Sequence, residues 1–302
     1  MANLRDVRLR MRAIKQTLQV TKAMNLISTA KLRKGRRMLE DTEPYFTRIQ
    51  KSMFDILSGA GRPDSRFLRK PDPEKSVRTT RTTRTAILAI TSDKGLAGGY
   101  NANIFRQVND LCSRVKNPVL ILIGTIGYRY FVHSPHVILE NFSFRSQIPT
   151  VGNARDISEY IISQYFQDVF NEVHIVYTHM YSAIKLLPDE LQILPLNTEK
   201  IQTKLSGMGS VERVGLHFEY IPSEAALFDA LVPLYINGMI YSCMVEAYAS
   251  EQSARMTAMD EASKSAEEML ADLQISYNRA RQAGITQEMS EIVGGSAALA
   301  DR

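Results

Sequence analysis

Tryptophan is absent from this 302-residue chain, and cysteine occurs only at Cys112 and Cys243. The two cysteines lie far apart and match no metal-ligand spacing, so they fit a reducing compartment better than a disulfide scaffold. No apolar run approaches the roughly 20 residues that span a bilayer. The basic start, MANLRDVRLRMR, lacks the apolar core of a signal peptide and runs on as mature structure. We therefore expect a cytoplasmic protein.

Catalytic and metal-binding patterns are equally scarce. No histidine has a cysteine or carboxylate at a metal-site spacing, and neither G-x-S-x-G nor a Ser/His/Asp order occurs. We expect no catalytic site, no metal site and no cofactor, and surface or strand-edge positions for His174 and His179. The histidines are His133, His136, His174, His179 and His217.

Acidic residues are nearly missing from residues 1–37, where Asp6 stands alone among many cations. Such a segment is either a solvated helix face or a surface for an acidic partner, such as nucleic acid, an anionic membrane or a carboxylate-rich protein. The cations are Arg5, Arg8, Arg10, Arg12, Lys15, Lys22, Lys31, Arg33, Lys34, Arg36 and Arg37.

The first 57 residues show a helical period. Only Gly35 and Pro44 interrupt the pattern, and small residues at Ala23 and Ala30 would allow close helix approach. At about 1.5 Å per residue, such a helix is roughly 80 Å long. The apolar stripe steps by three and four residues through Leu4, Val7, Met11, Ile14 and Leu18, and then drifts to Val20, Met24 and Ile27.

The middle of the chain changes period. Residues 58–84 are rich in Gly, Pro, Thr and cations, which is typical of a linker. Short β-branched runs follow, with helical patterns at 101–115 and 153–170 between them, and this alternation predicts a covered, mostly parallel sheet. A polar loop is expected at 197–215. The predicted strands are 85–91, 118–124, 172–178 and 190–196.

From about residue 222 the helical period returns and continues through Val293. Ser223 is a predicted N-terminal cap, and Pro233 should kink the helix without breaking it. Two long helices around a compact insert imply an antiparallel coiled coil. The expected stripes are Leu227, Leu231, Leu234, Tyr241, Val245 and Tyr248, then Met256, Met259, Ala266, Met269 and Leu273. The expected domains are 1–57 (coiled-coil helix), 58–84 (basic linker), 85–215 (α/β domain) and 216–302 (strand start and long helix).

The junction TSDKGLAGGYN (91–101) contains Gly95, Gly98 and Gly99. Glycines at a helix N-terminus can bind phosphate, but the spacing matches neither the P-loop nor the dinucleotide fingerprint. A tight turn that ends a strand is the better interpretation.

Three segments together resemble the gamma subunit of F-type ATP synthases. They are IKQTLQVTKAMNLISTAKLRK (14–34), SDKGLAGGYN (92–101) and the last segment, ASEQSARMTAMDEAS with YNRARQAGITQEMSEIVGGSAAL (249–299). The resemblance implies an α/β fold with a long antiparallel coiled coil, formed by the two terminal helices around an inserted Rossmann-like domain. It also implies a bacterial source, since neither a transit peptide nor a chloroplast-type cysteine insert is evident.

The resemblance further implies a mechanical role without chemistry on this chain. In that family the coiled coil is a shaft inside a hexamer of alpha and beta subunits, and the α/β domain lies at the membrane-proximal foot with the epsilon subunit and the c-subunit ring. Ion flow turns the ring and shaft, which drives the beta catalytic sites through their conformations. The expected location is therefore the cytoplasmic face of the bacterial plasma membrane, peripheral, with no nucleic acid bound.

Particular residues match the family's contacts with the beta subunit. Arg255, Gln282 and Thr286 correspond to side chains that hydrogen-bond a beta loop, and Met24 faces the beta lever region, where added charge should alter coupling. The basic face would meet acidic lever loops. It comprises Arg8, Lys15, Lys22, Lys31, Arg33 and Lys34.

The chain departs from the family pattern at Asn25, Lys94, Ala97 and Gly284. Since glycine costs a helix about 1 kcal/mol relative to alanine, we expect a softer shaft near Gly284. Two other functions stay open from the residues alone: a coiled-coil nucleic-acid-binding protein, suggested by the basic N-terminal segment, and a nucleotide-binding enzyme built on the α/β domain.

Overall fold

The computed structural model describes residues 4–59, 63, 65–68, 84–144, 148–182, 185–196, 221 and 223–300, with no side-chain description at 58–59 and 294–300. The chain divides into two compact units, one made of Met1–Thr29 with Arg255–Arg302 and the other of Ala30–Ala254. The long helices α1 (Leu4–Gly59) and α7 (Glu224–Ala300) each contribute to both units. Apart from the short 3-10 helix η1 (Arg66–Leu68), most of the predicted linker lies outside the described residues. The predicted loop at 197–215 lies outside them, and so does most of the expected strand start after 216.

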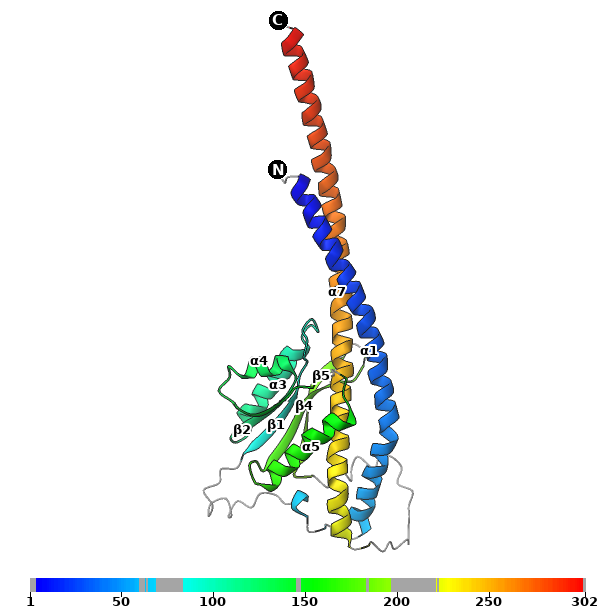
Figure 1. Ribbon diagram of the computed structural model, residues 1–302, viewed down its shortest axis with the longest axis vertical. Helices are drawn as coiled ribbons and strands as arrows, with labels where there is room; N and C mark the ends of the chain where they lie inside the picture. The colour runs from blue at the N-terminus through cyan, green and yellow to red at the C-terminus, as the bar shows by residue number, and fades with distance from the viewer. Residues whose placement is uncertain are drawn as a thin grey trace. The chain divides into compact units, whose positions relative to one another are not determined.

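A five-stranded sheet forms the centre of the unit 30–254 (Figure 1). Its strand order is β3-β2-β1-β4-β5, in which β5 alone is antiparallel to its neighbour. The predicted strands are confirmed, whereas β3 was not expected, because its polar residues and partial exposure hide the apolar signal of a buried strand. The strands are β1 (Thr85–Ile90), β2 (Pro118–Ile123), β3 (Val137–Phe142), β4 (Glu172–Met180) and β5 (Leu186–Leu194).

Helices cover both faces of this sheet. On one face, Ile87 and Ala89 of β1 contact the apolar stripe of α3 (Tyr100–Arg114), together with Phe131 at the end of α4 (Thr125–Phe131). Successive strand residues point to opposite faces, so Ala86 and Leu88 belong to the other core. The strand order reverses beside β1, as in doubly wound folds. The prediction of a covered, mostly parallel sheet is therefore confirmed.

The second and larger core joins the other face of the sheet to three helices. It includes Ile157 of α5 (Val151–Phe166), Met53 of α1 and Phe228 of α7, none of which is exposed to solvent. Truncating such a side chain to alanine costs about 2–5 kcal/mol. The parts of α1 and α7 that lie within residues 30–254 therefore share a core with the α/β domain.

Helix α7 begins at the predicted cap, since the Ala226 amide donates to Ser223 Oγ at 3.2 Å, and it continues past Pro233. The expected stripe is confirmed at Tyr241, Val245 and Tyr248, which are buried, but it is wrong at Leu234, which is 45% exposed. A stretch of 18 residues in α7 is long and apolar enough to cross a membrane, but half of it is buried within the protein, as in many core helices. The buried stripe at this end is Phe228, Val232, Ile236 and Ile240.

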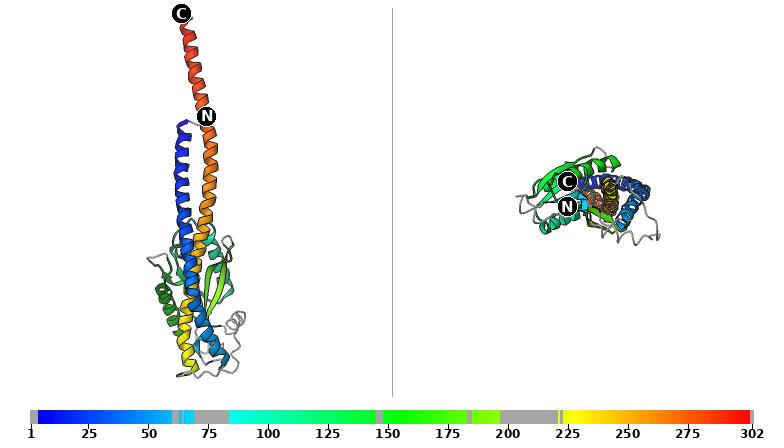
Figure 2. Two further views of the ribbon diagram at one scale, coloured as in Figure 1. Left: turned by 90° about the vertical axis from the view of Figure 1, so that its right-hand side faces the viewer. Right: turned by 90° about the horizontal axis from the view of Figure 1, so that it is seen from below.

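The unit formed by 1–29 and 255–302 is an antiparallel helix pair, as predicted (Figure 2). Residues early in α1 contact residues late in α7: Arg8 donates to the Tyr277 hydroxyl at 2.8 Å, and Asn25 donates to the Met256 carbonyl at 3.0 Å. The predicted stripe is correct as far as Leu18.

Beyond Leu18 the predicted stripe is wrong at Val20 and Ile27, whereas Met24 is half-buried. Val20 and Ile27 are 57% and 56% exposed, whereas Thr21 and Ser28 are buried. The buried positions keep the three- and four-residue spacing of the earlier stripe, but small polar side chains occupy them. Small side chains let the helices approach closely. The position of a residue on the helix, and not its hydrophobicity, therefore determines which side chains are buried here.

A glycine allows a close approach of α1 and α7 within the unit 30–254. A Cβ added at Gly35 would lie 3.3 Å from the side chains of both Ala249 and Tyr248. The small residues expected to allow this approach, Ala23 and Ala30, are instead exposed. Close contact therefore rests on Gly35 and Ala249.

Candidate functional site

The turn that follows β1 is held by hydrogen bonds of its own polar residues. The amide of Ser92 donates to Asn101 Oδ1 at 3.1 Å, and Asn101 Nδ2 donates to Ser92 Oγ at 2.7 Å. Asp93 Oδ1 accepts from the amide and the hydroxyl of Thr125, at 3.0 and 2.9 Å. Gly98 has a positive φ of 54°, a conformation that glycine adopts without strain. The motif is therefore a rigid turn.

This turn leaves little room for a phosphate. Asp93 places its carboxylate at the N-terminus of α4, the end of a helix to which an anion would otherwise be attracted. The neighbouring cavity at the ends of β1 and β2 holds about 50 Å³, far below the roughly 300 Å³ of a small-ligand site. The arrangement favours the interpretation of a structural turn.

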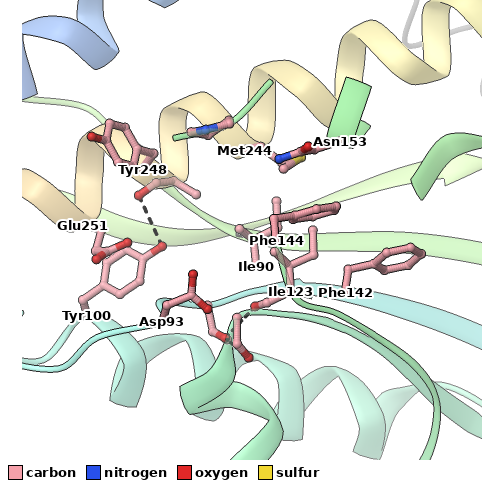
Figure 3. Close-up of a pocket in the computed structure, with 14 residues that line it drawn as sticks. Ile90, Asp93, Tyr100, Ile123, Phe142, Phe144, Asn153, Met244, Tyr248 and Glu251 are labelled. Carbon is pink, nitrogen blue, oxygen red and sulfur yellow. Dashed lines mark hydrogen bonds between the residues drawn. The ribbon is translucent and has the colours of Figure 1, made fainter. Parts of the chain in front are cut away.

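The same cavity marks where α7 crosses the carboxyl ends of the strands (Figure 3). The hydroxyl of Tyr100, at the start of α3, donates to the Ala247 carbonyl of α7 at 3.3 Å. Ser250 donates to the Thr178 carbonyl of β4 at 3.0 Å, and Glu246 accepts from the Met180 amide at 3.2 Å. Hydrogen bonds, in addition to apolar packing, therefore hold the sheet against α7.

The histidines of β4 lie next to carboxylates. His174 Nδ1 lies 3.1 Å from Glu190 Oε1, and His179 Nδ1 lies 2.5 Å from Glu246 Oε1. Within the described part of the chain, no group of three or more His, Cys, Asp or Glu side chains is arranged to hold a metal ion. These pairs connect β4 to β5 and to α7.

The predicted contact residues all lie in the helix-pair unit, but they do not form one cluster. Gln282 and Thr286 are exposed one helical turn apart on α7, where Thr286 Oγ1 donates to the Gln282 carbonyl at 2.9 Å. Met24 is half-buried on α1. Arg255 is only 7% exposed, so its aliphatic part packs within the unit.

Most of the predicted basic face is solvent-exposed. Lys22 forms an ion pair with Glu267 at 2.6 Å, and Arg8 bonds to Tyr277, so these two cations also connect the helices. Lys15, Arg33 and Lys34 are exposed and form no ion pair with any described residue, while Lys31 is half-buried. The unpaired members remain available to an acidic surface.

Sequence patterns missed a set of exposed apolar side chains, which are distributed along both helices of the helix-pair unit. Soluble monomers rarely expose large apolar patches, which usually mark interaction sites. The sequence gives one indication of these exposed side chains. After Leu18 the apolar residues no longer follow the helical period of the buried face, so they must lie elsewhere on the helix. These side chains are Leu9, Val20, Leu26 and Ile27 on α1, and Met269, Ile275, Ile285, Met289, Ile292 and Val293 on α7.

Comparison with known proteins identifies the family. Residues 3–299 match the family model described as ATP synthase. The chain is 40% identical over 300 residues to the ATP synthase gamma chain of Acetivibrio thermocellus, covering 99% of this chain and 100% of the relative. The chain belongs to the ATP synthase gamma chain family. The gamma chain of Ruminiclostridium cellulolyticum is 41% identical, with 98% and 99% covered, and a sodium ion specific gamma chain from Acetobacterium woodii is 34% identical, with 98% and 99% covered.

Solved structures share the fold of this gamma chain family member. A chain of the Euglena gracilis mitochondrial ATP synthase (OSCP/F1/c-ring) aligns with a TM-score of 0.66 at 18% identity, covering 98% of this chain and 94% of that one. A chain of the Tetrahymena thermophila central stalk and c-ring structure gives 0.57 at 22% identity, covering 81% and 99%. The fold predicted from the sequence, with terminal long helices around an α/β domain, is confirmed.

Proposed function

We propose that this chain is the central rotary shaft of an F-type ATP synthase, coupling ion flow through a membrane c ring to the conformational cycle of beta catalytic sites. The observation that carries this proposal is the full-length match to bacterial gamma chains. The antiparallel helix pair supports it, because two supercoiled helices resist bending and twisting better than one.

A shaft transmits work only if its contacts differ among the states of the surrounding subunits. The exposed side chains of the helix-pair unit are unevenly distributed, with apolar residues such as Leu26 and Ile292 alongside cations such as Lys15. An uneven surface presents a different face to each beta subunit at any moment, so rotation changes which conformation each subunit favours.

The unit 30–254 is suited to receive torque. Met53 and Phe228 pack against the sheet, and the polar bonds of Tyr100 and Ser250 fasten the sheet to α7. A force applied to the α/β domain would pass to α7 through these contacts. We assign the expected domain boundaries (1–57, 58–84, 85–215 and 216–302) to helix, linker, foot and helix accordingly.

The proposed partners are the alpha and beta subunits around the helix pair, and the epsilon subunit and c ring at the foot. Through them the chain would be peripheral to the cytoplasmic face of the bacterial plasma membrane. The chain would have no catalytic centre, cofactor or nucleic-acid ligand of its own. ATP chemistry would then reside on the beta subunits, with this chain controlling its timing.

Specific beta contacts follow from the family resemblance. Gln282 and Thr286 would hydrogen-bond a beta loop, which fits their exposure on one face of α7. Arg255 is buried, so only the end of its side chain could reach a partner. Met24 would face the beta lever region, and the basic face would meet acidic side chains there.

Reconstitution with purified alpha and beta subunits tests the proposal. The full chain should co-purify with the hexamer and stimulate its ATPase. Salt-sensitive DNA binding at physiological ionic strength, without hexamer association, would instead support the nucleic-acid-binding alternative. Tight nucleotide binding by the chain alone would support an enzyme built on the α/β domain.

A further inference from the structure

A surface groove in the unit 30–254 is not explained by the proposed function. It lies between α1, the first turns of α5 and α7, and has a volume of about 340 Å³. We call it the α1–α5–α7 groove. Pockets that bind small organic ligands have volumes of roughly 300–1,000 Å³, so the groove is large enough for a compact molecule.

The walls of the groove are mostly apolar. Tyr45, Val151 and Leu234 line it and remain 57%, 47% and 45% exposed. Phe46 and Tyr241 also line it, and Phe46 is fixed by stacking on Tyr235 with ring centroids 5.5 Å apart. An aromatic or branched apolar body would remove water from these side chains.

Two polar groups of the groove have no partner among the residues that the structure describes. The side-chain oxygen of Asn237 is buried and accepts no hydrogen bond from the described residues, which leaves an acceptor unsatisfied. Arg155 lines the groove on α5, is exposed and forms no ion pair within the described part of the chain. The positive N-terminal end of the 16-residue helix α5 adds to its charge. Glu43 of α1 also lines the groove, so the lining carries charges of both signs, and the group that would attract an anion is Arg155 on α5.

We propose that the α1–α5–α7 groove binds a small aromatic acid that carries an N–H or O–H donor. The ring lies between the apolar walls, the carboxylate pairs with Arg155, and the donor bonds to Asn237 Oδ1 as that amide turns into the groove. A small molecule fits better than a flat protein surface, because the unsatisfied oxygen is buried beneath the exposed apolar rim. This inference is independent of the rotary function.

Indole-3-acetate is a suitable probe, because it combines an aromatic body, an N–H donor and a carboxylate. Titration of the full chain, followed by calorimetry and NMR, should show saturable one-to-one binding. Indole-3-acetamide, which lacks the charge, and 1-methylindole-3-acetate, which lacks the donor, should each bind about tenfold more weakly, the usual loss for one such hydrogen bond.

Matched variants locate the site. Arg155→Gln should weaken indole-3-acetate binding about tenfold, and Ser242→Leu should abolish it by filling the groove. Arg129→Gln, an exposed arginine on α4, should leave affinity unchanged. Absence of saturable binding, or equal affinity in Arg155→Gln and the wild type, would overturn the proposal. So would loss of a subunit from the assembled complex in Ser242→Leu without probe binding to the wild type, since the groove would then be a protein interface.

Discussion

Two glycines of α7 stand in opposite environments. A Cβ at Gly238 would lie 2.6 Å from a ring carbon of Phe46, whereas a Cβ at Gly284 would have no atom within 4 Å. The substitution to alanine favours a helix by about 0.5–1 kcal/mol at either position. At Gly238 the clash should outweigh this gain, because overpacking costs about 1–3 kcal/mol.

We therefore expect Gly238→Ala to lower the free energy of unfolding and Gly284→Ala to strengthen α7 locally. Urea unfolding measures the first effect, and amide hydrogen exchange around residue 284 measures the second. Unchanged exchange in Gly284→Ala would refute the expectation of a softer helix at that position.

Burial raises the pKa of the Cys112 thiol from its ordinary value of 9.0 to about 11. Below about pH 9 the thiol is protonated in both folded and unfolded chains, and above it the unfolded chain loses this proton first. Stability should therefore fall as pH rises from 9 to 11, by less than about 1.4 kcal/mol per pH unit for this group.

Urea unfolding between pH 8.5 and 10.5 measures this effect. Cys112→Ala should flatten the decline with pH, whereas Ser113→Ala at the exposed neighbouring position should not. Identical slopes in Cys112→Ala and the wild type would show that the thiol does not contribute. Tyr235, whose pKa burial raises to about 12, contributes in all three proteins.

At the scale of elements, β1, β2 and β4 could be predicted because buried parallel strands form continuous apolar runs. The edge strand β3 contains Glu140 and Asn141, which interrupt its apolar run, so the sequence did not predict it as a strand. The α1 stripe failed after Leu18 because Thr21 and Ser28 form the buried face. Their burial depends on the partner helix, which local sequence does not contain.

The buried polar side chains between α1 and α7 give a prediction for the helix pair. Ser263 Oγ lies 2.8 Å from both Thr21 Oγ1 and the Met259 carbonyl, and both Ser263 and Thr21 are 7% exposed. Ser263→Ala should destabilise the pair by about 1 kcal/mol, the usual loss for one hydrogen bond. Hydrogen exchange in residues 4–29 and 255–293 should rise accordingly.

Thr257→Ala, at an exposed position of the same helix, is the control and should not increase exchange. If the amides of Ser263→Ala exchange as slowly as those of the wild type, the hydrogen bond between Ser263 and Thr21 has no role in holding the helices together.

At the scale of the whole molecule, the family resemblance predicts which residues contact the beta subunit, but it does not tell which of them are accessible. Gln282 and Thr286 are exposed as a contact surface requires, whereas Arg255 is only 7% exposed. Exposure of a residue on a long helix depends on supercoiling and on where the partner helix ends. Neither property belongs to a single motif.

The double variant Gln282→Ala/Thr286→Ala should lower the ATPase of the reconstituted complex roughly thirtyfold, as expected for two lost hydrogen bonds of about 1 kcal/mol each. Gln274→Ala/Asn278→Ala removes a similar exposed pair on the same helix and should have little effect. Equal ATPase in the two double variants would remove Gln282 and Thr286 from the proposed beta contact.

Direct observation of rotation tests the central claim. Cys112 and Cys243 are buried, so a cysteine introduced by His133→Cys at an exposed position can be labelled selectively. A bead attached there, on complexes immobilised through the alpha–beta hexamer, should turn continuously in one direction when ATP is supplied and stop when ATP is withdrawn. ATP hydrolysis by the same complexes with a stationary bead would contradict the account.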